Sequence, residues 1–190
     1  VTQCPFGATV DKSYITDVIK FINESKETNE FKVKAVIAPA FAAQFEFAKL
    51  GQVVTAIKEL GFSEVYEAAQ SADVVAYNEA KELEEKGFLT TSCCPAFVKY
   101  TENNFPELIP HISHNLSPMA EMGKILKAKE PGCKVVFIGP CTAKKAEFKL
   151  DKAKDYVDSV ITFEELQALI DSKDIIVEEL EESVLDDGTG

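Results

Sequence analysis

The stretch Thr90-Thr91-Ser92-Cys93-Cys94-Pro95-Ala96-Phe97 contains two adjacent cysteines followed by a proline, which is an unusual arrangement. The apolar, β-prone residues 88–91 predict a short strand before the cysteines. Pro95 favours the first turn of a following helix, where its missing N–H is not needed. We therefore expect the cysteines between the carboxyl end of a strand and the amino end of a helix, where open α/β folds bind ligands and where thiolates are stabilised.

A second cysteine follows the continuous apolar run 135–138, which is typical of a buried parallel strand. The run leads into Gly139-Pro140-Cys141-Thr142-Ala143-Lys144-Lys145-Ala146-Glu147, where a lysine-rich helical segment begins. Two such strand ends can face each other across a cleft, and thiolates gathered there would suit zinc or an iron–sulfur cluster. The adjacent cysteines alone would also fit a buried pair of small side chains or, more rarely, a vicinal disulfide.

These two motifs resemble those of the iron-only (di-iron) hydrogenases. Thr91-Ser92-Cys93-Cys94-Pro95 is similar to the family's first cysteine motif, and residues 140–147 are similar to the second. Asn104-Phe105-Pro106-Glu107-Leu108 and Ser117-Pro118 follow in the family's order, and the resemblance runs from about residue 32 to about residue 169. It implies a two-lobed α/β domain with mainly parallel sheets flanked by helices, incomplete at its C-terminal end.

The resemblance also implies an organisation of the chain. Residues 1–10 would be the remnant of a ferredoxin-like module, because Cys4-Pro5 is similar to the end of a bacterial ferredoxin cluster motif. Residues 11–30 carry apolar side chains at helical spacing and would form a linker helix. Residues 31–130 would be the first hydrogenase lobe and residues 131–190 a partial second lobe, each with one cysteine motif. A third family motif with two more cysteines is expected beyond the end of this chain.

The charge, the cysteine spacing and the apolar runs of the sequence exclude several classes of function. The 190 residues carry 20 Lys and Arg against 32 Asp and Glu, a net charge of −12, which argues against nucleic acid and anionic membranes as partners. The five cysteines are irregularly spaced and do not indicate a secreted disulfide framework. No apolar run approaches the length of a membrane span. These features predict a cytoplasmic protein.

The resemblance assigns roles to the cysteines. Cys94 and Cys141 correspond to ligands of a 4Fe–4S cluster, which needs four thiolates. Cys93 corresponds to a thiol that relays protons to the di-iron subcluster, and Lys144 corresponds to a lysine that hydrogen-bonds a cyanide of that subcluster. Cys4 would be a ligand of a ferredoxin-type cluster, but we expect it to bind nothing in this chain. With two family ligands present, the cluster and di-iron subcluster are expected to be absent or incomplete here.

A strand predicted over residues 32–38 ends at Ala38-Pro39-Ala40, which resembles a family segment lining the active cluster. An ordinary strand-to-helix turn is the alternative.

The charged residues of the second motif have simpler alternatives. Lys144 could be an exposed helix lysine. Lys145 is expected to face solvent, and Glu147 is expected to pair with one of these two lysines.

A proton route is implied by three further residues. Residues 72–86 predict a helix whose apolar stripe contains Glu79, with Glu82 on its shoulder. Burial there would favour a protonated carboxyl group suited to proton transfer. The resemblance places Glu79, Glu82 and Ser113 on the family's proton path. A solvated acidic helix end and a plain loop hydroxyl are the alternatives.

The sequence therefore predicts the catalytic-domain fragment of an iron-only hydrogenase, which interconverts protons, electrons and molecular hydrogen. Its expected partners are a ferredoxin-like electron donor or acceptor and hydrogenase maturation proteins. Gly139 stands where the family has methionine, and Ala96-Phe97 where it has Gly-Trp, which indicates a divergent subgroup. The alternatives are a non-catalytic redox or hydrogen sensor or iron–sulfur assembly factor. A zinc site is disfavoured by the adjacent cysteines and would use Cys93, Cys94, Cys133 and Cys141.

Overall fold

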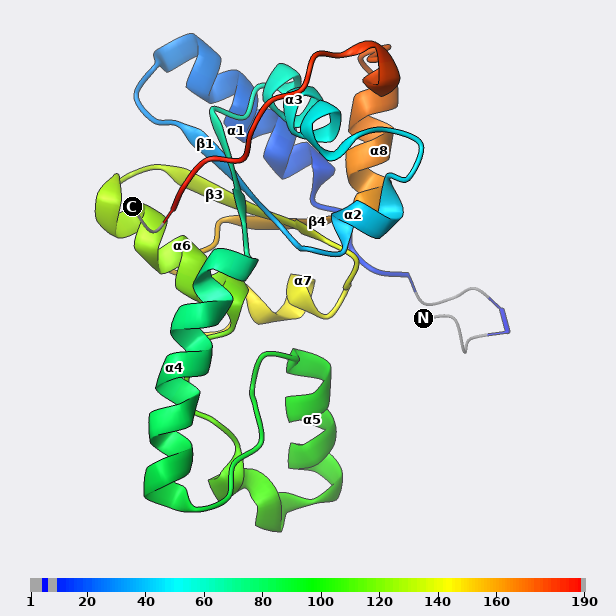
Figure 1. Cartoon of the computed structure of the whole chain (residues 1–190). Coiled ribbons are helices and arrows are strands. Elements are labelled where there is room, and N and C mark those ends of the chain that lie inside the picture. The colour runs from blue at the N-terminus through cyan, green and yellow to red at the C-terminus, as the bar shows by residue number, and fades with distance from the viewer. Residues whose placement is uncertain (1–4, 7–9, 189–190) are drawn as a thin grey trace.

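The computed structural model describes residues 5–6 and 10–188, and these form a four-stranded sheet with helices on both faces (Figure 1). The spatial order is β2-β1-β3-β4, and every neighbouring pair is parallel. The strands are β1 (Val33–Ile37), β2 (Glu64–Glu67), β3 (Lys134–Gly139) and β4 (Ser159–Thr162). The expected α/β class with a parallel sheet is confirmed.

Helices cover both faces of the sheet, as its continuous apolar strands require. One layer contains α1 (Ile15–Thr28), α3 (Leu50–Leu60) and α8 (Phe163–Asp171), and the other contains α6 (Pro118–Lys129) and α7 (Lys144–Glu147) (Figure 1). Two short helices, α2 (Phe41–Gln44) and η2 (Val177–Glu179), lie in connections. Within the described residues, no helix combines the length and apolar character needed to span a bilayer.

A third group of helices projects from this body. The helix α4 (Ala69–Lys86) starts beside α6 and runs away from the sheet, and α5 (Pro95–Asn104) and η1 (Pro106–His111) lie along its far part (Figure 1). The strand expected at residues 88–91 is not part of the sheet. Thr90 makes only an isolated parallel bridge to Ile112, because this segment lies in the projection, beyond reach of the other strands.

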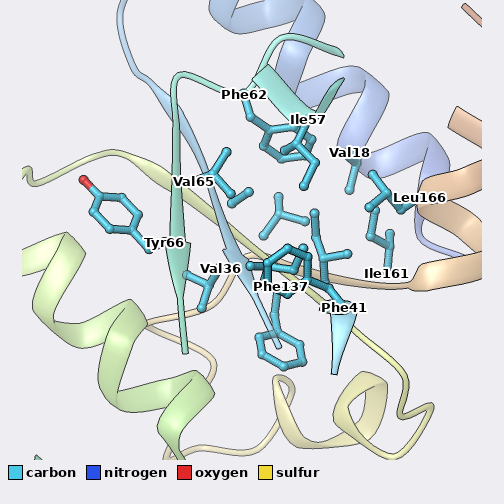
Figure 2. Close-up of a cluster of buried hydrophobic side chains, with 14 of the residues drawn as sticks. Val18, Val36, Phe41, Ile57, Phe62, Val65, Tyr66, Phe137, Ile161 and Leu166 are labelled. Atoms are coloured by element: carbon cyan, nitrogen blue, oxygen red, sulfur yellow. The ribbon is translucent and has the colours of Figure 1, made fainter. Parts of the chain in front are cut away.

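The core lies between the sheet and the α1–α3–α8 layer. Figure 2 shows Val65 of β2 and Ile161 of β4 on the side of the sheet that faces Ile57 of α3 and Val18 of α1, and all four side chains are buried. Tyr66 points to the opposite face, where its hydroxyl donates to Glu64 at 2.7 Å. Burial of these apolar side chains on both faces fixes the sheet in its register.

The strands come from both expected lobes. The strand β1 pairs with β3 from Val33↔Lys134 to Ile37↔Ile138, so the expected boundary at residue 130 falls between two strands of the same sheet. The segment expected as a linker helix buries Val18 and Ile22 in the core and is part of one helical layer.

The C-terminal strap, residues 177–188, differs from the loosely ordered tail that its acidic composition predicts. The Asp186 N–H donates to the Val65 carbonyl at 2.8 Å, and the Val65 N–H donates to Asp186 Oδ2 at 2.8 Å. The Ser183 N–H donates to the Gly51 carbonyl at 3.0 Å. Backbone hydrogen bonds to distant segments therefore hold the strap, and composition carries no signal of them.

Gly51 gives a test of this contact. A Cβ at Gly51 would lie 2.7 Å from the Glu182 Cβ and 2.9 Å from the Ser183 carbonyl oxygen. Gly51→Ala is therefore expected to push the strap outward and to raise amide exchange at Ser183 and Asp186, measured by hydrogen–deuterium exchange. Glu59→Ala, at an exposed position of the same helix, is the control. Unchanged exchange in Gly51→Ala would contradict the close packing.

Candidate functional site

The sheet has a topological switch point between β1 and β3. The chain leaves β1 through α3 toward β2, and it leaves β3 through α7 toward β4, on the opposite face and in the opposite direction (Figure 1). Loops that diverge in this way open a crevice at the carboxyl ends of the strands, where doubly wound sheets bind ligands. Ala38-Pro39-Ala40 follows β1 and Cys141 follows β3, so both lie at the carboxyl edge of the sheet.

The two loops approach closely. The Ala38 N–H donates to the Ile138 carbonyl at 2.8 Å. A Cβ at Gly139 would lie 3.1 Å from the Ala38 Cβ and 2.7 Å from Phe137 Cε1. A larger side chain at Gly139 would therefore force these residues apart, which is a local reason for glycine at a position where the resemblance leads one to expect methionine.

The first cysteine motif forms a loop at the start of α5. Cys94 is the N-cap residue of α5 and Pro95 is its first residue, as the sequence predicts. Cys93 and Cys94 are exposed free thiols, and Cys141 is a half-buried free thiol, so the disulfide alternative is excluded for these residues. Ser92 anchors the loop, because its buried hydroxyl donates to the Asn115 carbonyl at 2.9 Å.

Lys144 connects the two cysteine motifs. Its Nζ donates to the Cys93 carbonyl oxygen at 2.9 Å and lies 2.6 Å from Glu147 Oε2. The Glu147 side chain is only 1% exposed, and its pairing with a neighbouring lysine was expected from the sequence. Its second oxygen, Oε1, has no hydrogen-bond partner among the described residues. A buried carboxylate thus holds the Lys144 ammonium group beside the first motif.

Lys145 does not face solvent as expected. Its side chain is 6% exposed and pairs with carboxylates of Asp11 and Glu165. The short helix α7 turns this lysine inward, toward the first turn of α8, and turns Lys144 toward Cys93.

Two of the predicted proton-path residues are in direct contact. Ser113 Oγ donates to Glu82 Oε2 at 2.8 Å, and Lys86 Nζ lies 2.7 Å from Glu82 Oε1. The Asn115 amide donates to Glu82 Oε2 at 2.8 Å, and the His114 N–H donates to Glu82 Oε1 at 3.2 Å. Burial opposes the charge of Glu82, but these donors outweigh it and lower the pKa of Glu82 to about 2.

Sequence reasoning missed Lys86 and Asn115 as partners of Glu82. The Glu82–Lys86 spacing of four residues on a helix was a usable signal, since such pairs meet on one helix face. Asn115 carried no local signal, because the fold of the 112–117 loop brings its amide to α4.

Glu79 is half-buried, and its Oε1 is buried without a hydrogen-bond partner among the described residues. The prediction of a core-facing apolar stripe on this helix is wrong. Three residues of that stripe, Ala76, Ala80 and Leu83, are exposed. Only the first turns of α4 pack against the body of the protein, so helical periodicity alone does not define a core-facing stripe in its projecting part (Figure 1).

The remaining candidates do not form a metal site with these thiols. Cys133 is buried just before β3, and Cys141 follows the other end of that strand, roughly 20 Å away. The four-cysteine zinc site is thereby excluded. Burial raises the pKa of the Cys133 thiol. No three His, Cys, Asp or Glu side chains come together as a metal site within the described part of the chain. Cys4 lies outside the described residues.

Comparison with known families agrees with this geometry. Residues 31–190 match the family model for the C-terminal domain of the iron only hydrogenase large subunit. The chain belongs to this hydrogenase family. Iron hydrogenase 1 of Clostridium pasteurianum is 31% identical over 98% of this chain and 36% of its own length. The periplasmic Fe hydrogenase large subunit of Nitratidesulfovibrio vulgaris is 31% identical over 76% of this chain and 42% of its own length.

A solved FeFe-hydrogenase structure concerned with stepwise H-cluster assembly superposes with a TM-score of 0.81 at 26% identity. The match covers 94% of this chain and 51% of that chain, so this chain spans about half of the hydrogenase structure. This chain is also similar to proteins of another description. The cytosolic Fe-S cluster assembly factor NAR1 of Kluyveromyces lactis is 41% identical over 87 residues, which is 46% of this chain and 19% of that protein.

Proposed function

We propose that this chain forms part of the catalytic domain of an iron-only hydrogenase, which interconverts protons, electrons and molecular hydrogen. The observation that best supports the proposal is the Lys144 contact. The ammonium group of the second motif donates to the Cys93 carbonyl of the first at 2.9 Å, so a cation of one cysteine motif contacts the backbone of the other.

The donor chemistry at this place fits an iron–sulfur cofactor. Cys94 and Cys141 would hold a 4Fe–4S cluster, with Ala38-Pro39-Ala40 beside it at the switch point. The described residues bring no third ligand to these two thiols, so they would supply part of a ligand set. When bound, the cluster and a di-iron subcluster would supply the electron transfer and the proton reduction.

This chain's own residues would orient groups and move protons. Glu147 would hold Lys144 where its ammonium group can donate to an anionic ligand. The Cys93 thiol is exposed beside Thr91, whose hydroxyl oxygen lies 3.6 Å from its Sγ, and would exchange protons with the cofactor. Ser113 and Glu82 would pass protons along their 2.8 Å hydrogen bond, with Glu79 as a further member. Electrons would come from a ferredoxin-like partner.

A non-catalytic iron–sulfur protein is the second candidate. It is favoured by the 41% identity to an Fe-S cluster assembly factor and by Gly139, whose lack of a side chain alters packing beside Cys141. Under this alternative, the thiols would hold a cluster without hydrogen chemistry.

Hydrogen evolution distinguishes the two candidates. We expect this chain alone to be inactive, because it supplies only part of the ligand set, and we expect the complete catalytic domain that contains it to evolve hydrogen from a reduced viologen dye after iron–sulfur reconstitution and treatment with hydrogenase maturation proteins. Lys144→Met should lower the rate by about a hundredfold, because it removes the donor aimed at the cofactor. Lys154→Met is the control, since Lys154 pairs only with the exposed Asp151 among the described residues. Stable iron binding without hydrogen evolution would favour the second candidate.

A further inference from the structure

The buried Lys145 joins three separate segments of the chain. Its Nζ lies 2.6 Å from Asp11 Oδ2 and 2.9 Å from Glu165 Oε1. Asp11 precedes α1, and Glu165 belongs to the first turn of α8. Burial lowers the pKa of Lys145, but its bonds to the two carboxylates outweigh burial and raise the pKa overall. The three side chains therefore form an ionised cluster.

Glu165 is the fixed member of this cluster. Its carboxylate accepts the Thr162 N–H at 2.7 Å, and the Thr162 hydroxyl accepts the Glu165 N–H at 3.2 Å, which is the capping box of α8. The β4–α8 junction therefore holds Lys145, and Lys145 in turn holds Asp11. Ser13 also donates to Glu165, so residues 11–13 are attached to this one point.

Lys145 is also linked to the Cys141 turn through the backbone. The Lys145 N–H donates to the Thr142 carbonyl at 3.0 Å, and the Lys144 N–H donates to the Cys141 carbonyl at 3.2 Å. A displacement of the Lys145 backbone would therefore be transmitted to the cysteine.

Side chains do not fill the space between these segments. A cleft of about 590 Å³ is lined by Asp11 and Ser13 from one segment and by Pro140 and Thr142, on either side of Cys141, from another. Apolar packing resumes at Tyr14, whose ring meets Phe148 edge-on at 5.2 Å. Ahead of Tyr14, polar contacts hold the N-terminal segment to the cysteine turn.

We propose that Lys145 is a positioning residue for Cys141: with Asp11 and Glu165, it fastens residues 11–13 to the turn that carries this thiol. Docking of the N-terminal segment and placement of Cys141 are then coupled. Under the proposed function, the segment expected to arrive from the electron-carrier side sets the placement of a cluster ligand. This inference rests on the proposed function only where it makes Cys141 a cluster ligand. The coupling between the N-terminal segment and Cys141 can be measured in the protein without iron.

Thiol alkylation of the metal-free, reduced chain tests the coupling. Peptide mass spectrometry after iodoacetamide treatment gives a rate for each cysteine; Cys93 reports reagent reactivity, and the buried Cys133 reports global unfolding. Lys145→Met and Asp11→Asn are each expected to raise the Cys141 rate, relative to Cys93, by about fivefold through local opening, with Cys133 unchanged. If Lys145→Met does not fold, Asp11→Asn alone tests the coupling. The Asp11 side chain is 38% exposed, so its replacement should be compatible with folding.

Two further variants separate positioning from a general loss of stability. Lys145→Arg keeps the charge and should return the Cys141 rate to within about twofold of the parent. The double variant Lys145→Met with Asp11→Asn should react no faster than Lys145→Met alone, because both changes remove the same contact. Lys154→Met should leave the rate unchanged. An unchanged Cys141 rate in Asp11→Asn, or a Cys133 rate that rises in parallel, overturns the proposal.

Discussion

In the complete catalytic domain that contains this chain, replacing Cys94 or Cys141 by alanine is expected to remove the iron of the iron-loaded protein, whereas Cys93→Ala should keep the iron and lose most hydrogen turnover. Cys94 caps the amino end of α5, where backbone N–H groups and the helix dipole stabilise a thiolate ligand. Cys141 lies at the switch point of the sheet. The Cys93 side chain is exposed and its backbone is held by Lys144, so alanine would remove proton exchange alone, lowering turnover by about a hundredfold or more.

Iron and sulfide analysis, with hydrogen evolution measured on the same samples, checks this division of roles. Cys133→Ala is the matched control, because this thiol is buried at the far end of β3. It should keep both iron and turnover, at a cost of about 1 kcal/mol in unfolding free energy. If Cys93→Ala lost iron as completely as Cys94→Ala, the assignment of Cys93 to proton transfer would be wrong.

Glu82→Gln is expected to destabilise the protein by roughly 2 kcal/mol at pH 7, because it removes a charged acceptor from several donors. The folded-state pKa of Glu82 is about 2, against an ordinary value of 4.5. A depressed folded pKa means that the stabilisation is fully present above pH 4.5 and is lost as the pH falls toward 2. After a discount for solvent screening, the shift corresponds to about 2 kcal/mol. Chemical denaturation between pH 2 and 7 should therefore show a flatter profile for Glu82→Gln than for the parent.

Glu84→Gln, at an exposed position of the same helix, is the control and should keep the parental profile. Identical profiles for the parent and Glu82→Gln would show that the carboxylate is not held as described. The same variant bears on the proton route. The low pKa keeps Glu82 ionised at neutral pH, contrary to the protonated carboxyl group expected from the sequence, so Glu82 would act on the route as a proton acceptor. Glu82→Gln removes this acceptor and should slow turnover, while Lys81→Gln, on the other side of α4, should not.

Local sequence signals predicted the parts of the fold that local forces determine. The apolar run 135–138 forms β3, and Thr162 and Glu165, whose spacing of three residues is a local signal of a helix start, form the capping box of α8. The strand predicted for residues 88–91 is wrong, because a strand needs neighbouring strands to pair with. In the projecting segment, Thr90 forms a bridge with Ile112 alone. The prediction of a loosely ordered tail is also wrong. The strap is held by partners such as Val65, which lie far away in the sequence and leave no local signal.

Some features of the candidate site were predicted from the sequence, and others depend on contacts between distant segments. The sequence predicted that thiols and Lys144 belong together through a motif resemblance, and the crevice at Cys141 follows from the strand order, which no single segment reveals. Lys145 was expected to face solvent, as lysine side chains mostly do. Asp11 and Glu165, the groups that bury it, are 134 and 20 residues away. Buried ion pairs between distant segments leave no periodic signal.

The strap also bears on how this protein avoids self-association. The strand β2 is at the edge of the sheet, and an uncovered edge is a template on which a strand of another molecule can add. Asp186 occupies both outward-facing backbone groups of Val65, the N–H through its carboxylate and the carbonyl through its own N–H. An incoming strand therefore finds no free backbone group at Val65, and the Asp186 carboxylate is further held by Lys58 Nζ at 2.9 Å. Detachment of the strap would expose this rim, so its attachment also protects the folded chain against aggregation.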